Sequence, residues 1–304
     1  MRLLSSTDMA HFAARGFLRF DGIVPADINQ QFLDEVGDVP VDEIASPAEH
    51  YARVMARGSI PVIPAGQPLK QAYPEGGAVH RMLCLPEVAG AIRSLVGDNP
   101  GFDHHFLHIT FPPAFYGDDV PRAQHTHQDS TIDPRSAFDI QIMYFPHEVT
   151  ADMGGTRFVP GSHLRRVSEA AISRYQNIAG QQHVVCPAGT LLIMHMGIWH
   201  GGGANTSHRV RYMFKIRMYP TQRQARLWDI SDLPDEHFQQ RPIFWTGGAR
   251  DPGDIHTILT QPEPWFEMDT SRLEYINRIR FWRYLLGDEQ FDADFWLTRI
   301  ENEF

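Results

Sequence analysis

The first hundred residues alternate helical patterns of apolar positions with Pro- and Gly-rich connections. Thr7 and Asp8 are good helix-capping residues, and they precede the segment MAHFAARGF. Gly16 follows the last periodic position of this segment, so the pattern predicts a capped helix that ends there. The apolar segment FLRF, residues 17–20, is expected to form a short strand directly after it.

A second helix is predicted after Asp27, over the segment INQQFLDEV. Its apolar residues recur at the spacing that places them on one helical face. These positions are Ile28, Phe32 and Val36.

From about residue 102 to 220 the pattern changes to short apolar runs separated by turn residues. FDIQIMYF and VRYMFKIRMY alternate with a period of two, TRFVPGSH ends at Pro160-Gly161, and HVVCPAGTLLIMH holds two runs around a turn. Many short strands joined by turns indicate a β-sandwich, barrel or jelly roll. The positions expected on one side are Phe138, Ile140, Ile142 and Tyr144 in the first segment; in VRYMFKIRMY they are Val210, Tyr212, Phe214, Ile216 and Met218, opposite Arg211, Met213, Lys215 and Arg217.

The C-terminal part returns to mixed and helical character. A loop rich in Pro, Gly and Asp spans about residues 232–268, and an amphipathic helix ended by Gly287 is expected after it. The tail 291–304 is expected to pack as a further short helix. The apolar positions of the amphipathic helix are Leu273, Ile276, Ile279, Trp282, Leu285 and Leu286.

A chain of 304 residues fits one large β domain with helical additions, so a single domain over 1–304 is the expectation. Within it we expect a mixed, partly helical region over about 1–100. A β core that carries the motifs follows over 101–220, and a C-terminal loop and helical extension over 221–304.

Composition and charge narrow the range of functions. Hydrophobic residues make up 42% and charged residues 21%, which excludes global disorder. The net charge of −10, without a basic stripe, argues against a nucleic-acid partner and favours a small-molecule one. The chain shows no secretory signal and no run of about 20 apolar residues, so a cytoplasmic protein without membrane spans is expected.

Cys84 and Cys186 lie in apolar contexts and are predicted to be buried thiols.

The segment AQHTHQDST, residues 123–131, carries the first candidate chemistry. In an extended chain, His125, His127 and Asp129 project to the same side because they are two residues apart. Two imidazoles and one carboxylate form the triad that leaves three positions of an octahedral ion open. His-x-Asp supplies only two of these ligands and is weak by itself, so a distant histidine has to complete the site.

The segment WHGGGANTSHRVRY, residues 199–212, supplies that histidine. His200 ends an apolar strand, and the three glycines after it allow a close backbone approach. Arg211 follows His200 by 11 positions, and its planar guanidinium suits a carboxylate in a way that lysine does not copy.

Together these motifs resemble the phytanoyl-CoA dioxygenase family of iron(II)/2-oxoglutarate oxygenases. The family shows H-x-D, a segment close to NGxxxxxPGSH, and HGxGxNxS followed by an arginine. This chain has HQD at 127–129, MGGTRFVPGSH at 153–163 and HGGGANTSHRVR at 200–211, and FAARGFLRFDGIV also resembles the family's opening. The resemblance covers about residues 8–220. It implies a double-stranded β-helix (jelly-roll, cupin-like) core with flanking helices.

The resemblance also implies roles for individual residues. His127, Asp129 and His200 would bind iron(II), and Arg211 would pair with the distal carboxylate of 2-oxoglutarate. O2 is the co-substrate, and the implied products are succinate, CO2 and a substrate hydroxylated at an unactivated C–H bond. Gln124 and Thr156 match positions that contact 2-oxoglutarate in some relatives. Where the family usually has Asn-Gly, this chain has Met153-Gly154, a departure that concerns a turn more than the metal.

Several residues compete for these roles. In an alternative H-x-H arrangement of the cupin type, His125 would take the place of His127 as a ligand. A downstream acid such as Asp133 would then be required. His195 competes with His200, but the arginine spacing selects His200. Arg209 is an alternative to Arg211. His163 is expected to pack in a turn, and Lys215 and Arg217 are expected on a solvated strand face.

Two other classes of function stay open on the sequence. One is a non-oxidative metal-dependent cupin enzyme, an isomerase or lyase, that uses His125, His127 and His200. The other is a non-catalytic jelly-roll binding protein. Desaturation, cyclisation and epimerisation also remain open as outcomes of the oxygenase, as do the substrate and the oligomeric state. Candidates for the substrate pocket are His105, Tyr116 and Trp199, and Arg165-Arg166 is the only evident cradle for a CoA phosphate group.

Overall fold

The computed structural model describes residues 1–119, 121–129, 139–165, 167–174, 177–223, 226–233, 252–261, 263 and 268–291. The helices in these residues are α1 (Ser6–Arg15), α2 (Ala26–Val36), α3 (Pro47–Ala56), α4 (Ala78–Leu83), α5 (Pro86–Val96), α6 (Glu169–Ile172), α7 (Ile255–Thr260) and α8 (Met268–Leu286). The strands are β1 (Phe17–Phe20), β2 (Gly101–Thr110), β3 (Ile140–Phe145), β4 (Thr156–Phe158), β5 (Gln182–His183), β6 (Thr190–His195), β7 (His200–Gly202) and β8 (Arg211–Tyr219).

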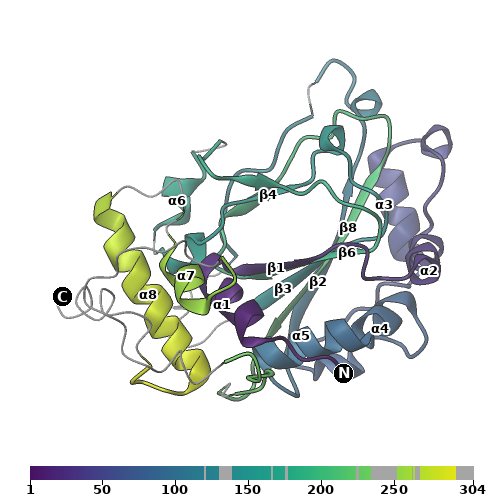
Figure 1. The fold of residues 1–304 in the computed structure, drawn as a ribbon. Helices are drawn as coiled ribbons and strands as arrows, with labels where there is room; N and C mark the ends of the chain where they lie inside the picture. Colours follow the sequence, from purple (N-terminus) through teal and green to yellow (C-terminus); the bar gives the residue numbers. More distant parts are fainter. Residues whose placement is uncertain are drawn as a thin grey trace.

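Two antiparallel sheets form the core of the described chain. The larger has the strand order β1-β6-β3-β8-β2, and the smaller has the order β5-β4-β7. Helices α1, α2, α4 and α5 cover one face of the larger sheet, and β4 lies on its other side (Figure 1). The prediction of a mainly β, jelly-roll core with flanking helices is therefore confirmed. The first region contributes a strand to it, because Phe17–Phe20 pairs with β6.

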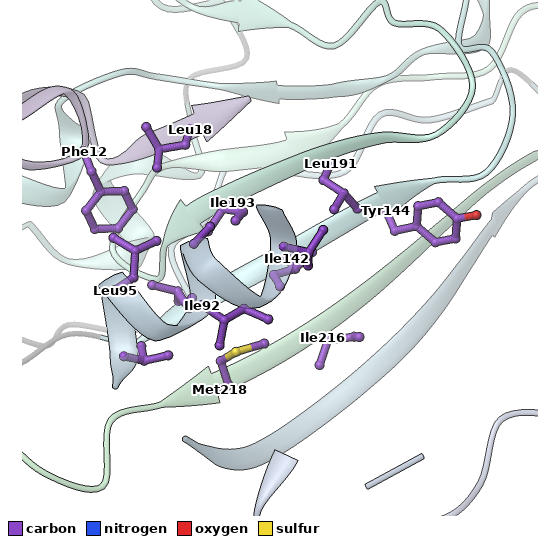
Figure 2. Packing of buried hydrophobic residues seen from close by; sticks show 14 of the residues in the cluster. Phe12, Leu18, Ile92, Leu95, Ile142, Tyr144, Leu191, Ile193, Ile216 and Met218 are labelled. Carbon is purple, nitrogen blue, oxygen red and sulfur yellow. The ribbon is translucent and has the colours of Figure 1, made fainter. Parts of the chain in front are cut away.

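The helix cluster packs on alternate positions of the strands. Tyr212, Phe214 and Ile216 of β8 are buried in the same apolar cluster as Ile142 of β3 and Ile193 of β6, as the alternation predicts. Figure 2 shows Ile92 and Leu95 of α5 in the same apolar layer as Ile142, Ile193 and Ile216 of these strands. Because the helices close this face, the chemistry has to lie on the opposite face, between the two sheets.

The first two helices form as predicted, but other residues cap them. Ser5, not Thr7 or Asp8, is the N-cap of α1, and Asp8 lies three residues later, where its carboxylate completes a capping box. Gly16 ends α1 in the left-handed conformation, as expected. α2 begins after Pro25, whose side chain has no polar atom to cap the helix, and Asp27 lies in the first turn, where its carboxylate pairs with Arg81.

The C-terminal helix α8 also forms as predicted and ends before Gly287, whose φ is 67°. Its positions Ile276, Ile279, Trp282, Leu285 and Leu286 are buried, whereas Leu273 is 49% exposed, so the apolar face begins one turn later than expected. α7 lies inside the segment predicted as a loop. The tail beyond residue 291 and Phe138 lie outside the described residues. No helix in the described ranges is long and apolar enough to cross a membrane.

Of the two predicted buried thiols, Cys186 is buried and Cys84 is exposed. Cys84 follows the last residue of the short helix α4 and lies 3.7 Å from Nε2 of His80, one turn earlier. The buried residues of this helix are Ala78, Val79 and Met82. The apolar neighbours of Cys84 in the sequence therefore do not bring its thiol inside.

Candidate metal centre

The two histidines of the separate motifs meet across an isolated antiparallel bridge between His127 and His200. The N–H of His127 donates to the carbonyl of His200 at 2.9 Å, and the N–H of His200 donates to the carbonyl of His127 at 2.8 Å. Directly opposed residues in an antiparallel pair place their side chains on the same side. The ring centroids accordingly lie 4.4 Å apart.

Asp129 completes the group. Its backbone N–H donates to the carbonyl of Met196, and its carboxylate lies 3.3 Å from Nε2 of His200 and 3.8 Å from Nε2 of His127. One potential ligand atom from each of the three residues lies within 4.8 Å of the others. Two imidazole nitrogens and one carboxylate oxygen at this spacing fit a facial triad for a divalent transition metal.

Hydrogen bonds set the tautomer of both rings. Nδ1 of His127 donates to the carbonyl of His125 at 2.9 Å, and Nδ1 of His200 donates to the carbonyl of Ile198 at 2.9 Å. In a neutral imidazole the other nitrogen then carries the lone pair. Each Nε2 is therefore prepared as a ligand, and each backbone carbonyl holds its ring in place.

The electrostatics of the group favour a bound cation. Burial, followed by the charge of His200, lowers the pKa of His127, so the ring is neutral. Burial alone would raise the pKa of Asp129, but the hydrogen bond from His200 and the nearby charges of His200, Lys215 and His127 hold it well below its usual range. The site thus presents an ionised carboxylate beside the neutral ring of His127.

His127, Asp129 and His200 are called the metal group below. Arg211, the first residue of β8, lies next to them. Its Nη1 donates to the carbonyl of Met153 at 3.1 Å, and its Nη2 donates to Oγ1 of Thr110, the residue opposite it on β2, at 2.9 Å. Both acceptors are neutral and leave the positive charge of the guanidinium unbalanced. Within the described residues, the buried Nε of Arg211 has no hydrogen-bond partner. Burial lowers the pKa of Arg211 to about 10, which still leaves it charged. A buried guanidinium in this state suits a carboxylate ligand.

One cavity of about 190 Å³ joins these groups. His127 and His200 line it together with Arg211 and Lys215. The two further residues that the sequence singled out also line it, Gln124 and Thr156. The Oε1 of Gln124 accepts a hydrogen bond from the N–H of Gly202, and the hydroxyl of Thr156 lies 3.7 Å from the sulfur of Met143. The cavity therefore has room for a small acid between the metal group and Arg211.

The glycines after His200 pass directly against the turn before β4. A Cβ on Gly203 would meet the backbone of Gly154 at 2.9 Å, and a Cβ on Gly154 would meet the carbonyl oxygen of Ala204 at 2.0 Å. Gly154 also has a φ of 64°. Because the preceding residue, Met153, accepts a hydrogen bond from Arg211, this turn supports the arginine as well as the chain reversal.

Lys215 and Arg217, expected on a solvated face, turn inward instead. Nζ of Lys215 lies 3.5 Å from Oδ2 of Asp129, and the Lys215 side chain is 8% exposed. Nη1 of Arg217 lies 3.4 Å from the carbonyl of Asp129, and Arg217 pairs with the carboxylates of Asp103 and Asp139. Both residues share the face of β8 that carries Arg211, and this face lies against the metal group rather than solvent.

The competing ligands lie elsewhere. His125 is exposed, and Asp133 lies outside the described residues. The fully buried ring of His195 lies 5.1 Å from that of His163. Nε2 of His163 approaches the carbonyl of Ala13 at 3.2 Å, so His163 packs in its turn as expected. Arg209 is exposed.

The candidates for the substrate pocket do not gather at the cavity. His105 lies opposite Ile216 on the helix-covered face, where it approaches the hydroxyl of Tyr73 at 2.9 Å. Trp199 packs against Val159 and Ile172, and Tyr116 is 37% exposed. Arg166 lies outside the described residues.

Two further residues of β2 that line the cavity, His108 and Thr110, were not predicted from the sequence. His108 and Thr110 of β2 line the cavity because they pair with Met213 and Arg211. Burial, with the charges of Lys215 and Arg211, lowers the pKa of His108 to about 4, so this wall residue is neutral. The alternation of GFDHHFLHIT contained the signal, but only the pairing with β8 shows which set of side chains faces the cavity.

Comparison with curated proteins finds two mycobacterial relatives. The uncharacterized protein Rv1501 of Mycobacterium tuberculosis and the uncharacterized protein Mb1539 of Mycobacterium bovis are each 28% identical over 129 residues. The matched region covers 42% of this chain and 46% of each relative, so it spans less than half of their length.

The solved structures that resemble this chain include a non-heme enzyme. The α-ketoglutarate-dependent carbocyclase SnoK from nogalamycin biosynthesis is 18% identical, with a TM-score of 0.50 over 71% of this chain and 84% of that one. HygX from Streptomyces hygroscopicus, crystallised with nickel and 2-oxoglutarate, is 13% identical, with a TM-score of 0.47 over 73% of this chain and 91% of that one. At these identities the similarity to SnoK concerns the fold.

A family match covers most of the chain. Residues 12–213 match the phytanoyl-CoA dioxygenase (PhyH) family, a range that includes all the motifs named from the sequence. This match and the metal-binding geometry of His127, Asp129 and His200 agree with the predicted cofactors, iron(II) and 2-oxoglutarate. The chain belongs to the phytanoyl-CoA dioxygenase (PhyH) family.

Proposed function

We propose that this protein is an iron(II)/2-oxoglutarate-dependent dioxygenase that hydroxylates an unactivated C–H bond of a small organic molecule. One observation carries the proposal. A single cavity places a 2-His-1-carboxylate group beside a buried arginine whose charge is not balanced by its two acceptors. A metal site with open positions next to an anchor for a carboxylate is what a chelating dicarboxylic acid requires.

Each residue would have a distinct part in binding. His127, Asp129 and His200 would hold the metal, with both imidazoles oriented by their Nδ1 hydrogen bonds. Arg211 would bind the distal carboxylate of 2-oxoglutarate, while Met153 and Thr110 keep its guanidinium in place. Gln124 and Thr156 line the cavity between these ends and would contact the bound acid.

The bound metal would supply the oxidation, in which 2-oxoglutarate gives succinate and CO2 and one oxygen atom of O2 enters the substrate. The chain would position the substrate C–H bond and keep stray reductants out of the cavity. The presence of Asp129 favours oxygen transfer, because related halogenases leave this position without a carboxylate. The inner walls formed by Met143 and Met213 would surround the reacting end of the substrate.

Anaerobic titration with iron(II) and then 2-oxoglutarate tests the proposal. A weak visible charge-transfer band is expected when 2-oxoglutarate chelates the bound metal. Arg211→Ala should need at least about 10-fold more 2-oxoglutarate, because a hydrogen bond to a charged group contributes roughly 1.5–3 kcal/mol. Arg209→Ala is the matched control, since this exposed arginine lies two residues earlier on the same chain segment. It should titrate like the wild type.

Two results would contradict the proposal. Absence of the band in the iron-loaded wild type at every 2-oxoglutarate concentration would exclude the chelate. Equal effects of the two arginine substitutions would exclude Arg211 as the specific anchor. Under air, the iron-loaded protein should also convert 2-oxoglutarate slowly to succinate without substrate, and addition of the right substrate should accelerate this conversion and yield an alcohol.

A further inference from the structure

Lysine is rare in this chain. The 27 basic residues include only two lysines, Lys70 and Lys215. Lys70 is exposed. Lys215, by contrast, is buried in the centre of β8 and lines the cavity of the metal group. In a chain that uses arginine at almost every basic position, the buried lysine lies beside the carboxylate of Asp129.

The contacts of Lys215 converge on Asp129. Its Nζ lies 3.5 Å from Oδ2 of that residue and 5.7 Å from the ring centre of Phe106, the residue opposite it on β2. On its other side Lys215 pairs with Met143 of β3. The side chain is therefore confined between two neighbouring strands, and its ammonium is directed at the carboxylate.

We propose that Lys215 is a positioning residue for Asp129. By engaging one carboxylate oxygen, it makes Asp129 present a single oxygen to the metal, so that the remaining positions stay open for 2-oxoglutarate and O2. This inference rests on the proposed function. The inference adds a supporting residue to the proposed site, beyond the three ligands and Arg211.

The chemistry of lysine suits this task. An ammonium is a compact charge with three donors on a flexible stem, whereas a guanidinium is a broad planar fork. Arg217, two residues along the same face, approaches the backbone carbonyl of Asp129 at 3.4 Å. One strand thus approaches both the side chain and the main chain of Asp129, while its first residue, Arg211, lines the same cavity as Lys215.

A role in positioning and a role as a nearby charge predict opposite effects on metal binding. Removing a positive charge beside a divalent cation would by itself tighten metal binding, because like charges repel. Removing a partner that orients a ligand weakens it, typically by about 10–100-fold. The sign of the change therefore separates the two roles.

The experiment is anaerobic equilibrium dialysis of the full chain with iron(II), for the wild type, Lys215→Met, Lys215→Arg and Lys70→Met. Lys215→Met is expected to bind iron(II) about 10-fold more weakly. Lys215→Arg keeps a cationic donor but with a broader planar fork, so it should restore only part of the affinity. Lys70→Met should match the wild type. If circular dichroism shows that Lys215→Met does not fold, Lys215→Gln replaces it in the same comparison.

Unchanged or tighter iron binding by Lys215→Met would overturn the inference. The charge-transfer titration provides a second readout: at saturating iron(II), Lys215→Met should need more 2-oxoglutarate and give a shifted band, because Asp129 can then use both oxygens. If the wild type binds iron(II) but gives no band with 2-oxoglutarate, the proposed function fails, while the comparison of iron affinities still decides the role of Lys215.

Discussion

His127 and His200 exchange backbone hydrogen bonds across one antiparallel bridge, and each ring donates its Nδ1 proton to the carbonyl two residues before it. The same local geometry therefore occurs twice, on segments 73 positions apart in the sequence. As a result, both Nε2 atoms approach the carboxylate of Asp129 with their lone pairs available. The metal group is thus prepared by the backbone, and side-chain identity supplies only the ligand atoms.

Replacing one candidate ligand should strongly weaken metal binding without unfolding the protein. His200→Ala removes Nε2 but keeps the backbone bridge to His127. Iron(II) affinity should fall at least about 100-fold, since even loss of a partner behind a ligand costs roughly 10–100-fold. His125→Ala is the matched control, because the carbonyl that holds His127 belongs to the main chain and survives. Equal losses in both variants, measured by equilibrium dialysis, would favour the H-x-H arrangement.

Thr110 should contribute to 2-oxoglutarate binding without touching the metal. Its hydroxyl accepts a hydrogen bond from Nη2 of Arg211, and Thr110→Val removes this acceptor at nearly constant volume. The dissociation constant of 2-oxoglutarate should rise about 10-fold, because hydrogen bonds to charged groups contribute roughly 1.5–3 kcal/mol. Iron(II) affinity should stay constant. Thr221→Val, at an exposed threonine, provides the control, and an unchanged constant in Thr110→Val would exclude this support for Arg211.

Gly154→Ala should destabilise the fold more than an equivalent change in open space. Gly154 has a φ of 64°, and a new Cβ would meet the carbonyl oxygen of Ala204 at 2.0 Å. Gly117 has a φ of 59° with no atom within 4 Å of such a Cβ. Gly117→Ala should therefore lose only the roughly 1–2 kcal/mol of left-handed strain, and Gly154→Ala more. Urea unfolding measures the difference, and equal losses would contradict the close approach of the two turns.

His195 should make stability depend on pH. Burial lowers its pKa to about 3, whereas a histidine in the unfolded chain titrates near about 6.5. Below that value the unfolded state binds a proton that the folded state does not, so the free energy of unfolding should fall as the pH drops from about 6.5 towards 3. The slope contributed by one such group is up to about 1.4 kcal/mol per pH unit.

Substitution isolates this contribution. His195→Asn keeps an acceptor for the N–H of Gly197, which donates to Nδ1 of the histidine in the wild type. Urea unfolding of this variant should depend less steeply on pH between about 6.5 and 5 than that of the wild type. His183→Asn, at an exposed histidine, should retain the wild-type slope. A wild-type slope in His195→Asn would show that another group dominates.

The strands and helices with strong periodicity were predictable because burial acts on each segment separately. The alternation of VRYMFKIRMY correctly placed Phe214 and Ile216 on the apolar side. The same pattern did not show what lies against the other side. There Lys215 was interpreted as solvated, since a charged residue on a strand ordinarily faces water, and the carboxylate that balances it is 86 positions away in the sequence.

The sequence by itself named the candidate ligands and the candidate anchor, because H-x-D, a histidine before a glycine run and an arginine 11 positions later together resemble the motifs of one family. Only the tertiary structure decided which residues of each strand face the cavity and which neighbours support the candidate ligands. The pairing of β2 with β8 directs His108 rather than His105 to the cavity, and the packing of the two sheets brings Lys215 to Asp129. Side chains along a strand alternate between the two faces of the sheet. A shift of one residue in the pairing register would therefore reverse each of these assignments, and no single strand contains the information that fixes the register.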